Sequence, residues 1–140
     1  MKIIYVHHAD INYNDKEKVQ LEENLLVEKL ANIKASAIYT STNPSCKHTA
    51  ELLNNKINVQ LYEEERFIET AEFEQIQEKT NDAIDEIVNK HNSKDDVVIC
   101  IGSGNNVSAF IYYFTRTEPC NENPWIQALT FSTILFTTNN

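Results

Sequence analysis

Three short segments carry side chains that could bind or transform a charged ligand, and each directly follows an apolar run. They are residues 7–10 (His-His-Ala-Asp), residues 41–48, which hold two serines, a cysteine, a lysine and a histidine, and residues 102–106 (Gly-Ser-Gly-Asn-Asn). Histidine changes charge near neutral pH and can serve as a nucleophile or proton carrier. Backbone amides at the start of a helix bind anions. These three segments are therefore the candidate site.

Alternating strands and helices are predicted to position these segments. Short runs rich in β-branched and aromatic residues predict strands at 3–6, 37–40, 57–61, 97–101 and 129–136. Apolar residues at helical spacing predict helices at 21–33, from Asn43-Pro44 to about Leu53, over 73–91, and after Gly104. This order predicts a three-layer α/β/α sandwich with a mostly parallel sheet, in one domain over residues 1–140. In such sheets ligands bind beyond the carboxyl ends of the strands, where the three segments would meet.

The composition limits the kinds of partner. The chain has 140 residues, of which 41% are hydrophobic and 24% charged, as in a globular protein. Its net charge of −9 disfavours nucleic acid and anionic lipid, and it gives no long-range attraction for phosphorylated substrates. No apolar run approaches the ~20 residues that span a bilayer, and the apolar start is too short for a signal peptide. We expect a cytoplasmic protein without membrane or nucleic-acid partners.

Cysteine chemistry and dinucleotide binding are both disfavoured by the motifs. Cys46, Cys100 and Cys120 are an odd number without a CxxC pair, which argues against a disulfide framework or a zinc knuckle. The sixth residue after each cysteine is not arginine, so the loop of a cysteine-dependent phosphatase is missing. The Gly102-Ser103-Gly104 turn lacks the third glycine of a dinucleotide fingerprint and lies late in the chain.

In four pieces, taken in order, the chain resembles the histidine phosphatase superfamily, which includes the phosphoglycerate mutases. Residues 2–14 (KIIYVHHADINYN) are similar to its opening strand and Arg-His-Gly motif. Residues 37–53 (AIYTSTNPSCKHTAELL) are similar to the strand and helix that carry its second arginine. Residues 64–70 (EERFIET) are similar to the segment of its acid, and residues 97–110 (VVICIGSGNNVSAF) to the turn of its second histidine. The resemblance implies a phosphoglycerate mutase-like fold.

The resemblance also implies a site that has lost most of its cationic groups. The chemistry of the family needs a histidine nucleophile, an acid for the leaving oxygen, and a pocket of two arginines and a second histidine. The two arginines are matched by His7 and Ser45, and the second histidine by Ser103 or, with a shift of one residue, by Gly102. Ala9 stands in place of the glycine after the nucleophile. Neither Lys47 nor Arg66 matches a family arginine.

Three residues match the family: His8 as nucleophile, Glu69 as acid and Asn14 as a phosphate contact. The resemblance thus implies two catalytic residues, His8 and Glu69, if the site is active, and the ligand-binding set His7, Asn14, Ser45, Ser103 and Gly104. The alternative for His8 is a buried histidine satisfied by backbone, and for Glu69 an ordinary solvated acid.

The sequence supports three hypotheses. The first is a pseudoenzyme with a binding or assembly role, whose partner is a small phosphorylated ligand or a protein. The second is a divergent phosphohydrolase that uses His8 and Glu69, with the amides of residues 102–106 replacing the lost cations. The third is a zinc protein that joins His7, His8 and His48. We expect no cofactor and no metal, and the sequence does not specify an oligomeric state.

Overall fold

The computed structural model describes residues 1–8, 14–68, 72–116 and 133–137. These residues form four helices and a five-stranded sheet with the strand order β3-β2-β4-β1-β5. None of the described helices is long and apolar enough to cross a membrane.

Four of the five strands are parallel. They are β1 (Lys2–His7), β2 (Ala37–Thr40), β3 (Gln60–Glu63) and β4 (Val97–Gly102). The fifth, β5 (Thr133–Thr137), runs antiparallel beside β1 at one edge of the sheet. The mostly parallel sheet predicted from the sequence is confirmed.

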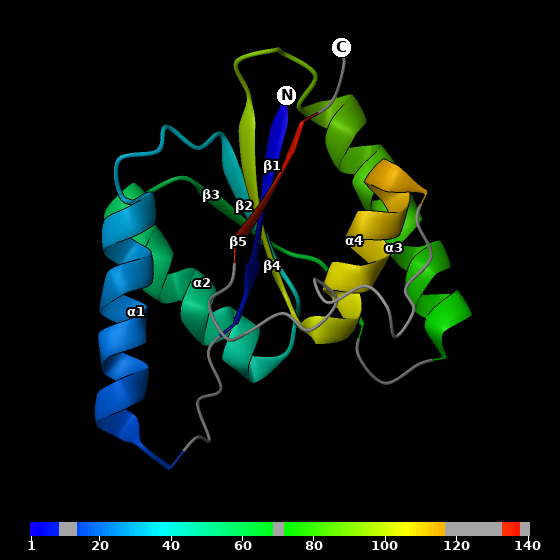
Figure 1. The fold of residues 1–140 in the computed structure, drawn as a ribbon. Coiled ribbons are helices and arrows are strands. Elements are labelled where there is room, and N and C mark those ends of the chain that lie inside the picture. The colour runs from blue at the N-terminus through cyan, green and yellow to red at the C-terminus, as the bar shows by residue number, and fades with distance from the viewer. Residues whose placement is uncertain (9–13, 69–71, 117–132, 138–140) are drawn as a thin grey trace.

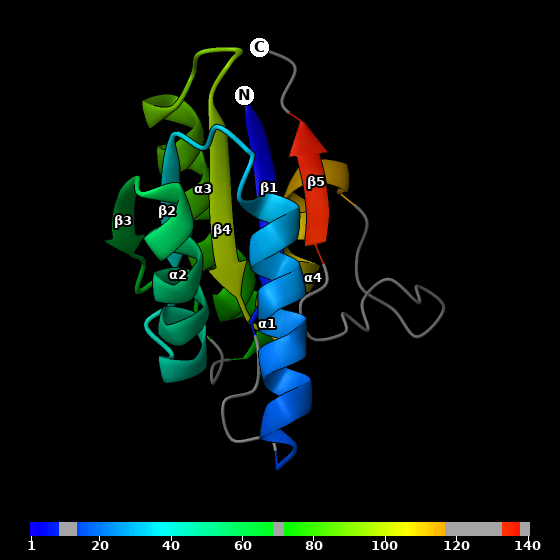
Figure 2. The same ribbon diagram turned by 90° about the vertical axis from the view of Figure 1, so that its left-hand side faces the viewer.

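Two helices cover each face of the sheet, as Figures 1 and 2 show. The helices α1 (Lys16–Leu30) and α2 (Pro44–Ile57) pack together on one face, and α3 (Phe73–Lys90) and α4 (Gly104–Thr115) pack together on the other. Each face of the sheet has its own cluster of buried apolar residues, so helices shield both faces from water. Cys100, predicted as a buried small hydrophobe, lies fully buried in β4. The predicted α/β/α layering is confirmed.

The ends of three elements differ from the sequence prediction, and local hydrogen bonds explain why. Helix α1 begins before residue 21 because the Asp15 side chain accepts a hydrogen bond from Lys18 N (3.1 Å) and caps it. Helix α2 continues past Leu53 until Asn58, whose left-handed backbone (φ 58°) ends it. The strand predicted at 57–61 therefore begins only at Gln60. The predicted strand at 129–136 is confirmed where it is described, as β5.

On the face of the sheet that α3 covers, Tyr39 of β2 contacts His91, which follows α3. The Tyr39 hydroxyl lies 2.9 Å from His91 Nε2. Burial, with the neighbouring Tyr62, raises the pKa of Tyr39 to about 12. Burial lowers the pKa of His91 below its usual 6.5. At neutral pH this hydrogen bond therefore joins a protonated tyrosine to a neutral imidazole.

This contact predicts a loss of stability under mild acid. Because the pKa of His91 is lower in the folded protein than in the unfolded chain, the unfolded chain binds more protons once the pH falls below about 6.5. The free energy of unfolding should decrease between pH 7 and pH 5, and the decrease should be small because the ring is only half-buried. Urea unfolding at the two pH values measures this. His91→Gln should make the difference smaller, and an unchanged difference would contradict the assignment.

Candidate functional site

The described residues of the three candidate segments, 7–8, 41–48 and 102–106, lie at one end of the sheet. Strands β1, β2 and β4 end there, and helices α2 and α4 begin there, at the lower end of the sheet in Figure 1. The register of the strands brings their ends together, because His7 of β1 lies opposite Gly102 of β4 and Thr40 of β2 lies opposite Ile101 of β4. Carboxyl ends of parallel strands are where α/β proteins bind ligands.

The two histidines at the end of β1 form a stacked pair. The centroids of their rings are 4.8 Å apart, and the two ring planes are nearly parallel. Both residues are half-buried. His7 Nδ1 lies 2.9 Å from the carbonyl oxygen of His8, and the backbone N–H of His8 donates to Gly102 O (3.1 Å). A Cβ atom on Gly104 would lie 3.6 Å from His7 Nε2. The first turn of α4 thus lies directly beside the pair.

Asn106 is the centre of a neutral hydrogen-bond network in the β4–α4 turn. Its Oδ1 accepts from both the backbone N–H and the hydroxyl of Ser103, each at 3.1 Å, and its Nδ2 donates to Ile68 O at 3.0 Å. The Tyr5 hydroxyl donates to Ser103 O. Asn106 is fully buried and Ser103 is 8% exposed. Ser103 is therefore committed to a network inside the protein.

A second buried hydrogen bond holds the segment before Glu69. The Ser41 hydroxyl, at the end of β2, donates to Phe67 O at 2.8 Å, and the Phe67 ring is buried against Phe110. Asn106 holds the next carbonyl, that of Ile68. One side chain at the end of β2 and one in the first turn of α4 thus hold the dipeptide Phe67–Ile68. Glu69, the predicted acid, and Ala9 lie outside the described residues.

Ser45, a predicted ligand-binding residue, lies in the first turn of α2. The Asn43 side chain caps the helix by accepting from Ser45 N at 2.8 Å, and Pro44 occupies the first turn. Ser45 is 7% exposed, so the side chain at this position is enclosed by protein. Asn14, the predicted phosphate contact, is exposed just before α1, and no described contact joins it to the other site residues.

Gly102, the alternative match to the family's second histidine, has no room for a larger side chain in this structure. A Cβ atom on Gly102 would lie 2.7 Å from the Tyr5 hydroxyl and 2.9 Å from Asn106 Oδ1. Buried strands and a hydrogen-bonded network surround both atoms, so a larger side chain has no room there.

Two cations that match no family arginine, Lys47 and Arg66, form ion pairs with acidic residues. Lys47 Nζ pairs with Glu63 Oε1 at 2.8 Å. Arg66 binds both carboxylate oxygens of Glu64, with Nε to Oε1 at 2.6 Å, and also contacts Glu86. Both cations therefore pair with acidic residues around β3 and α3.

The zinc hypothesis is not supported by the described part of the chain. There, no three histidine, cysteine or acidic side chains come together as a metal site. His48 is exposed on α2 and its Nε2 lies 3.2 Å from Glu23 Oε1 of α1, whereas His7 and His8 stack on each other. The three imidazoles do not converge.

Sequence reasoning placed Ser41 and Asn106 within the candidate segments but gave their side chains no role, and it did not find Tyr5. Tyr5 lies within an apolar run, which indicates only a buried strand. Ser103 and Asn106 do carry a signal, because a serine followed three residues later by an amide is the spacing of a capping box. The partners of Asn106 in the Phe67–Ile68 segment have no sequence signal.

The mostly parallel sheet between two helix layers, with a histidine pair at the end of β1, agrees with the phosphoglycerate mutase-like fold that the resemblance implies. The sequence model of the histidine phosphatase superfamily (branch 1) matches residues 2–71, half of the chain. The chain belongs to this superfamily. No curated protein matches it in sequence.

Solved structures agree with this fold. YhfR of Bacillus stearothermophilus is 16% identical, with a TM-score of 0.77 over 96% of this chain and 89% of that one. Phosphoserine phosphatase from Entamoeba histolytica, solved with 3-phosphoglyceric acid, is 12% identical, with a TM-score of 0.77 over 96% and 89%. A phosphoglycerate mutase from Bacillus anthracis is 11% identical, with a TM-score of 0.75 over 98% and 88%.

Proposed function

We propose that the chain is a pseudoenzyme of the histidine phosphatase superfamily, which binds a small phosphorylated ligand or a protein partner without turning it over. The observation that carries this proposal is the network around Asn106. Ser103, which the resemblance matches to the family's second histidine, is nearly buried and bonds to Asn106. A neutral, internally satisfied network replaces a group that would face the phosphoryl oxygens.

The missing arginines add to this argument. Phosphoryl transfer depends on preorganised donors, and the loss of one such donor typically lowers a rate by ~100- to 1,000-fold. Ser45 cannot supply a permanent charge in bidentate geometry, which among side chains is specific to arginine. Lys47 and Arg66 are paired with acids, so neither is available without breaking an ion pair.

The ligand class comes from the neighbours. The Entamoeba enzyme was solved with 3-phosphoglyceric acid, and a mycobacterial neighbour is a glucosyl-3-phosphoglycerate phosphatase. We therefore propose that any ligand retained by this chain is a small phosphorylated acid or sugar, held by His7, Asn14, Ser45, Ser103 and Gly104. In the alternative, an active phosphohydrolase, His8 is the nucleophile and Glu69 the acid.

The purified protein is expected to show no appreciable hydrolysis of p-nitrophenyl phosphate or of phosphorylated sugars between about pH 5 and 8, where histidine changes charge. Release of inorganic phosphate measures this, with a phosphatase of the same fold as the positive control. His8→Ala is the matched variant. Hydrolysis that His8→Ala abolishes, while its melting temperature stays close to that of the wild type, would refute the pseudoenzyme and support the alternative.

A further inference from the structure

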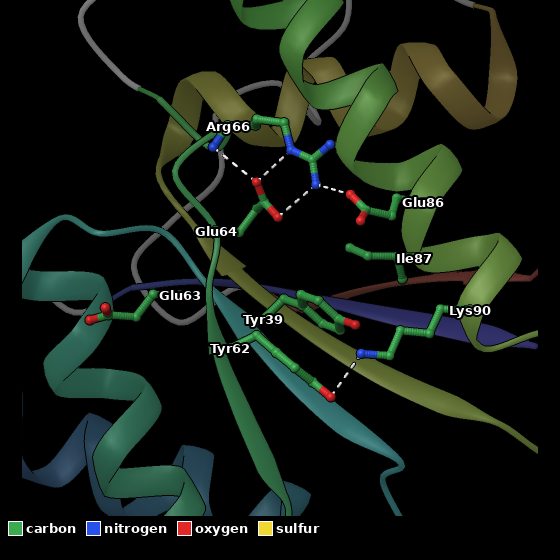
Figure 3. A pocket seen from close by; sticks show the side chains of 8 residues that line it. All are labelled: Tyr39, Tyr62, Glu63, Glu64, Arg66, Glu86, Ile87 and Lys90. Carbon is green, nitrogen blue, oxygen red and sulfur yellow. Dashed lines mark hydrogen bonds and ion pairs between the residues drawn. The ribbon is translucent and has the colours of Figure 1, made fainter.

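A pocket of about 150 Å³ lies between the β3 edge of the sheet and α3, and the proposed function does not use it (Figure 3). Its floor is the stacked pair of Tyr39 and Tyr62, with ring centroids 4.7 Å apart. Ile87 and Glu86 of α3 line the opposite side. Glu63 also lines it, but Figure 3 shows its side chain directed away toward α2.

The pocket already holds two internal cations. The Lys90 ammonium lies 4.1 Å from the centroid of the Tyr62 ring and donates to its hydroxyl at 2.9 Å. The Arg66 guanidinium lies between Glu64 and Glu86. Burial by itself raises the pKa of Glu64, but hydrogen bonds from Arg66 outweigh it, so the pKa is lowered and the carboxylate stays charged. An aromatic face and ionised carboxylates together attract cations.

The aromatic floor belongs to a row of side chains that ends at an open strand. Tyr39 lies opposite Cys100 on one side and opposite Tyr62 on the other. Among the described residues, β3 pairs with β2 alone and is the last strand of the sheet. A strand added beside β3 would place a side chain next to Tyr62, about 5 Å away, as the next member of that row.

We propose that this edge binds an extended, basic segment of a partner protein, whose lysine or arginine enters the pocket in place of Lys90. The backbone of the segment would pair with β3, and alternate side chains would reach the pocket, as in other cases of strand addition. Lys90 is exposed, so it can leave the Tyr62 ring at little cost. The net charge of −9 attracts a basic partner and repels an acidic one. The site lies apart from the His7–His8 pair and does not depend on whether that site is active.

The test is fluorescence anisotropy with a labelled short peptide that alternates lysine with valine or threonine. The same peptide with glutamate for lysine tests charge, and one with proline at alternate positions tests backbone pairing. We expect the lysine peptide alone to bind. Lys90→Ala should tighten its Kd by about threefold to tenfold, because the internal competitor is removed. Lys79→Ala is the matched control: it removes the same charge from an exposed position on the same helix, and it should change the Kd much less.

Two further pairs of variants separate binding from folding. Glu86→Gln should weaken binding about threefold or more, and Glu78→Gln, an exposed acid of α3, should not. Tyr62→Phe keeps the ring and should retain binding, whereas Tyr62→Ala should lose it. The proposal is overturned if Lys90→Ala and Lys79→Ala behave alike, or if the glutamate or proline peptide binds as well. Self-association of the protein that Tyr62→Ala abolishes would also overturn it, because a second copy would then cover the edge.

Discussion

Replacing Asn106 by alanine is expected to lower the melting temperature by about 10 °C, the largest change in stability that we predict for a single residue. The side chain makes three buried hydrogen bonds, two to Ser103 and one to Ile68 O. With alanine at this position, the groups that bonded to Asn106 stay buried without a hydrogen-bond partner. Each unsatisfied group lowers the free energy of unfolding by ~1–3 kcal/mol. A total of about 3 kcal/mol corresponds to roughly 10 °C in a domain of this size. Differential scanning calorimetry measures the change.

Asn89→Ala is the control, since Asn89 is exposed on α3 and should shift the melting temperature by a degree or two at most. Ser103→Ala should fall between the two, because it removes only the hydroxyl and leaves the backbone N–H of Ser103 bonded to Asn106. If Asn106→Ala is as stable as Asn89→Ala, the network does not hold the turn, and the central observation behind the proposed function is lost.

Rebuilding the cationic pocket is expected to create phosphate binding. The variant His7→Arg, Ser45→Arg, Ser103→His places the family's three missing groups around His8 at the strand ends. Groups of such a constellation act together, so each arginine alone should do little. In the triple variant, inorganic phosphate at a hundred times its Kd would stabilise the fold by about 2.7 kcal/mol, which is a rise of several degrees in melting temperature. The wild type should show no such rise.

The structure adds one condition to this experiment. Ser103→His also removes the hydroxyl that bonds to Asn106, so the triple variant should start from a lower melting temperature than the double variant with the two arginines. For each variant, the melting temperature with phosphate is compared with the melting temperature without it, so the different starting values do not affect the result. A folded triple variant without any phosphate response would show that these positions do not face a common pocket. Turnover is a poorer measure, because Ala9 and the acidic surface oppose it.

The sequence predicted the layers well because strands and helices buried on the sheet follow apolar patterns. Residues 97–101 are apolar throughout since β4 is covered on both faces. The same argument explains the error at β3. Ile57 is apolar because it packs at the end of α2 against the second core cluster, and pattern alone cannot separate the end of a helix from the start of a strand.

The site was predictable in its location but not in its contacts. Rules for parallel sheets place His8, Ser45 and Ser103 at the same end. The bond from Asn106 to Ile68 joins residues far apart in the chain, and its partner is a backbone carbonyl, which every residue type offers. The roles of Glu69 and Asn14 stay predictions.

The position of β1 has a consequence for how the chain folds. This strand lies inside the sheet, where Lys2 is opposite both Val97 of β4 and Thr137 of β5. Both neighbouring strands come much later in the chain. Pairing with them closes long loops, and the entropy cost of this closure arises before the stabilising contacts form. Refolding should therefore take milliseconds to seconds rather than microseconds. During synthesis, β1 stays unpaired until β4 and β5 have been made. In that interval its apolar residues would be exposed and would be a binding segment for chaperones.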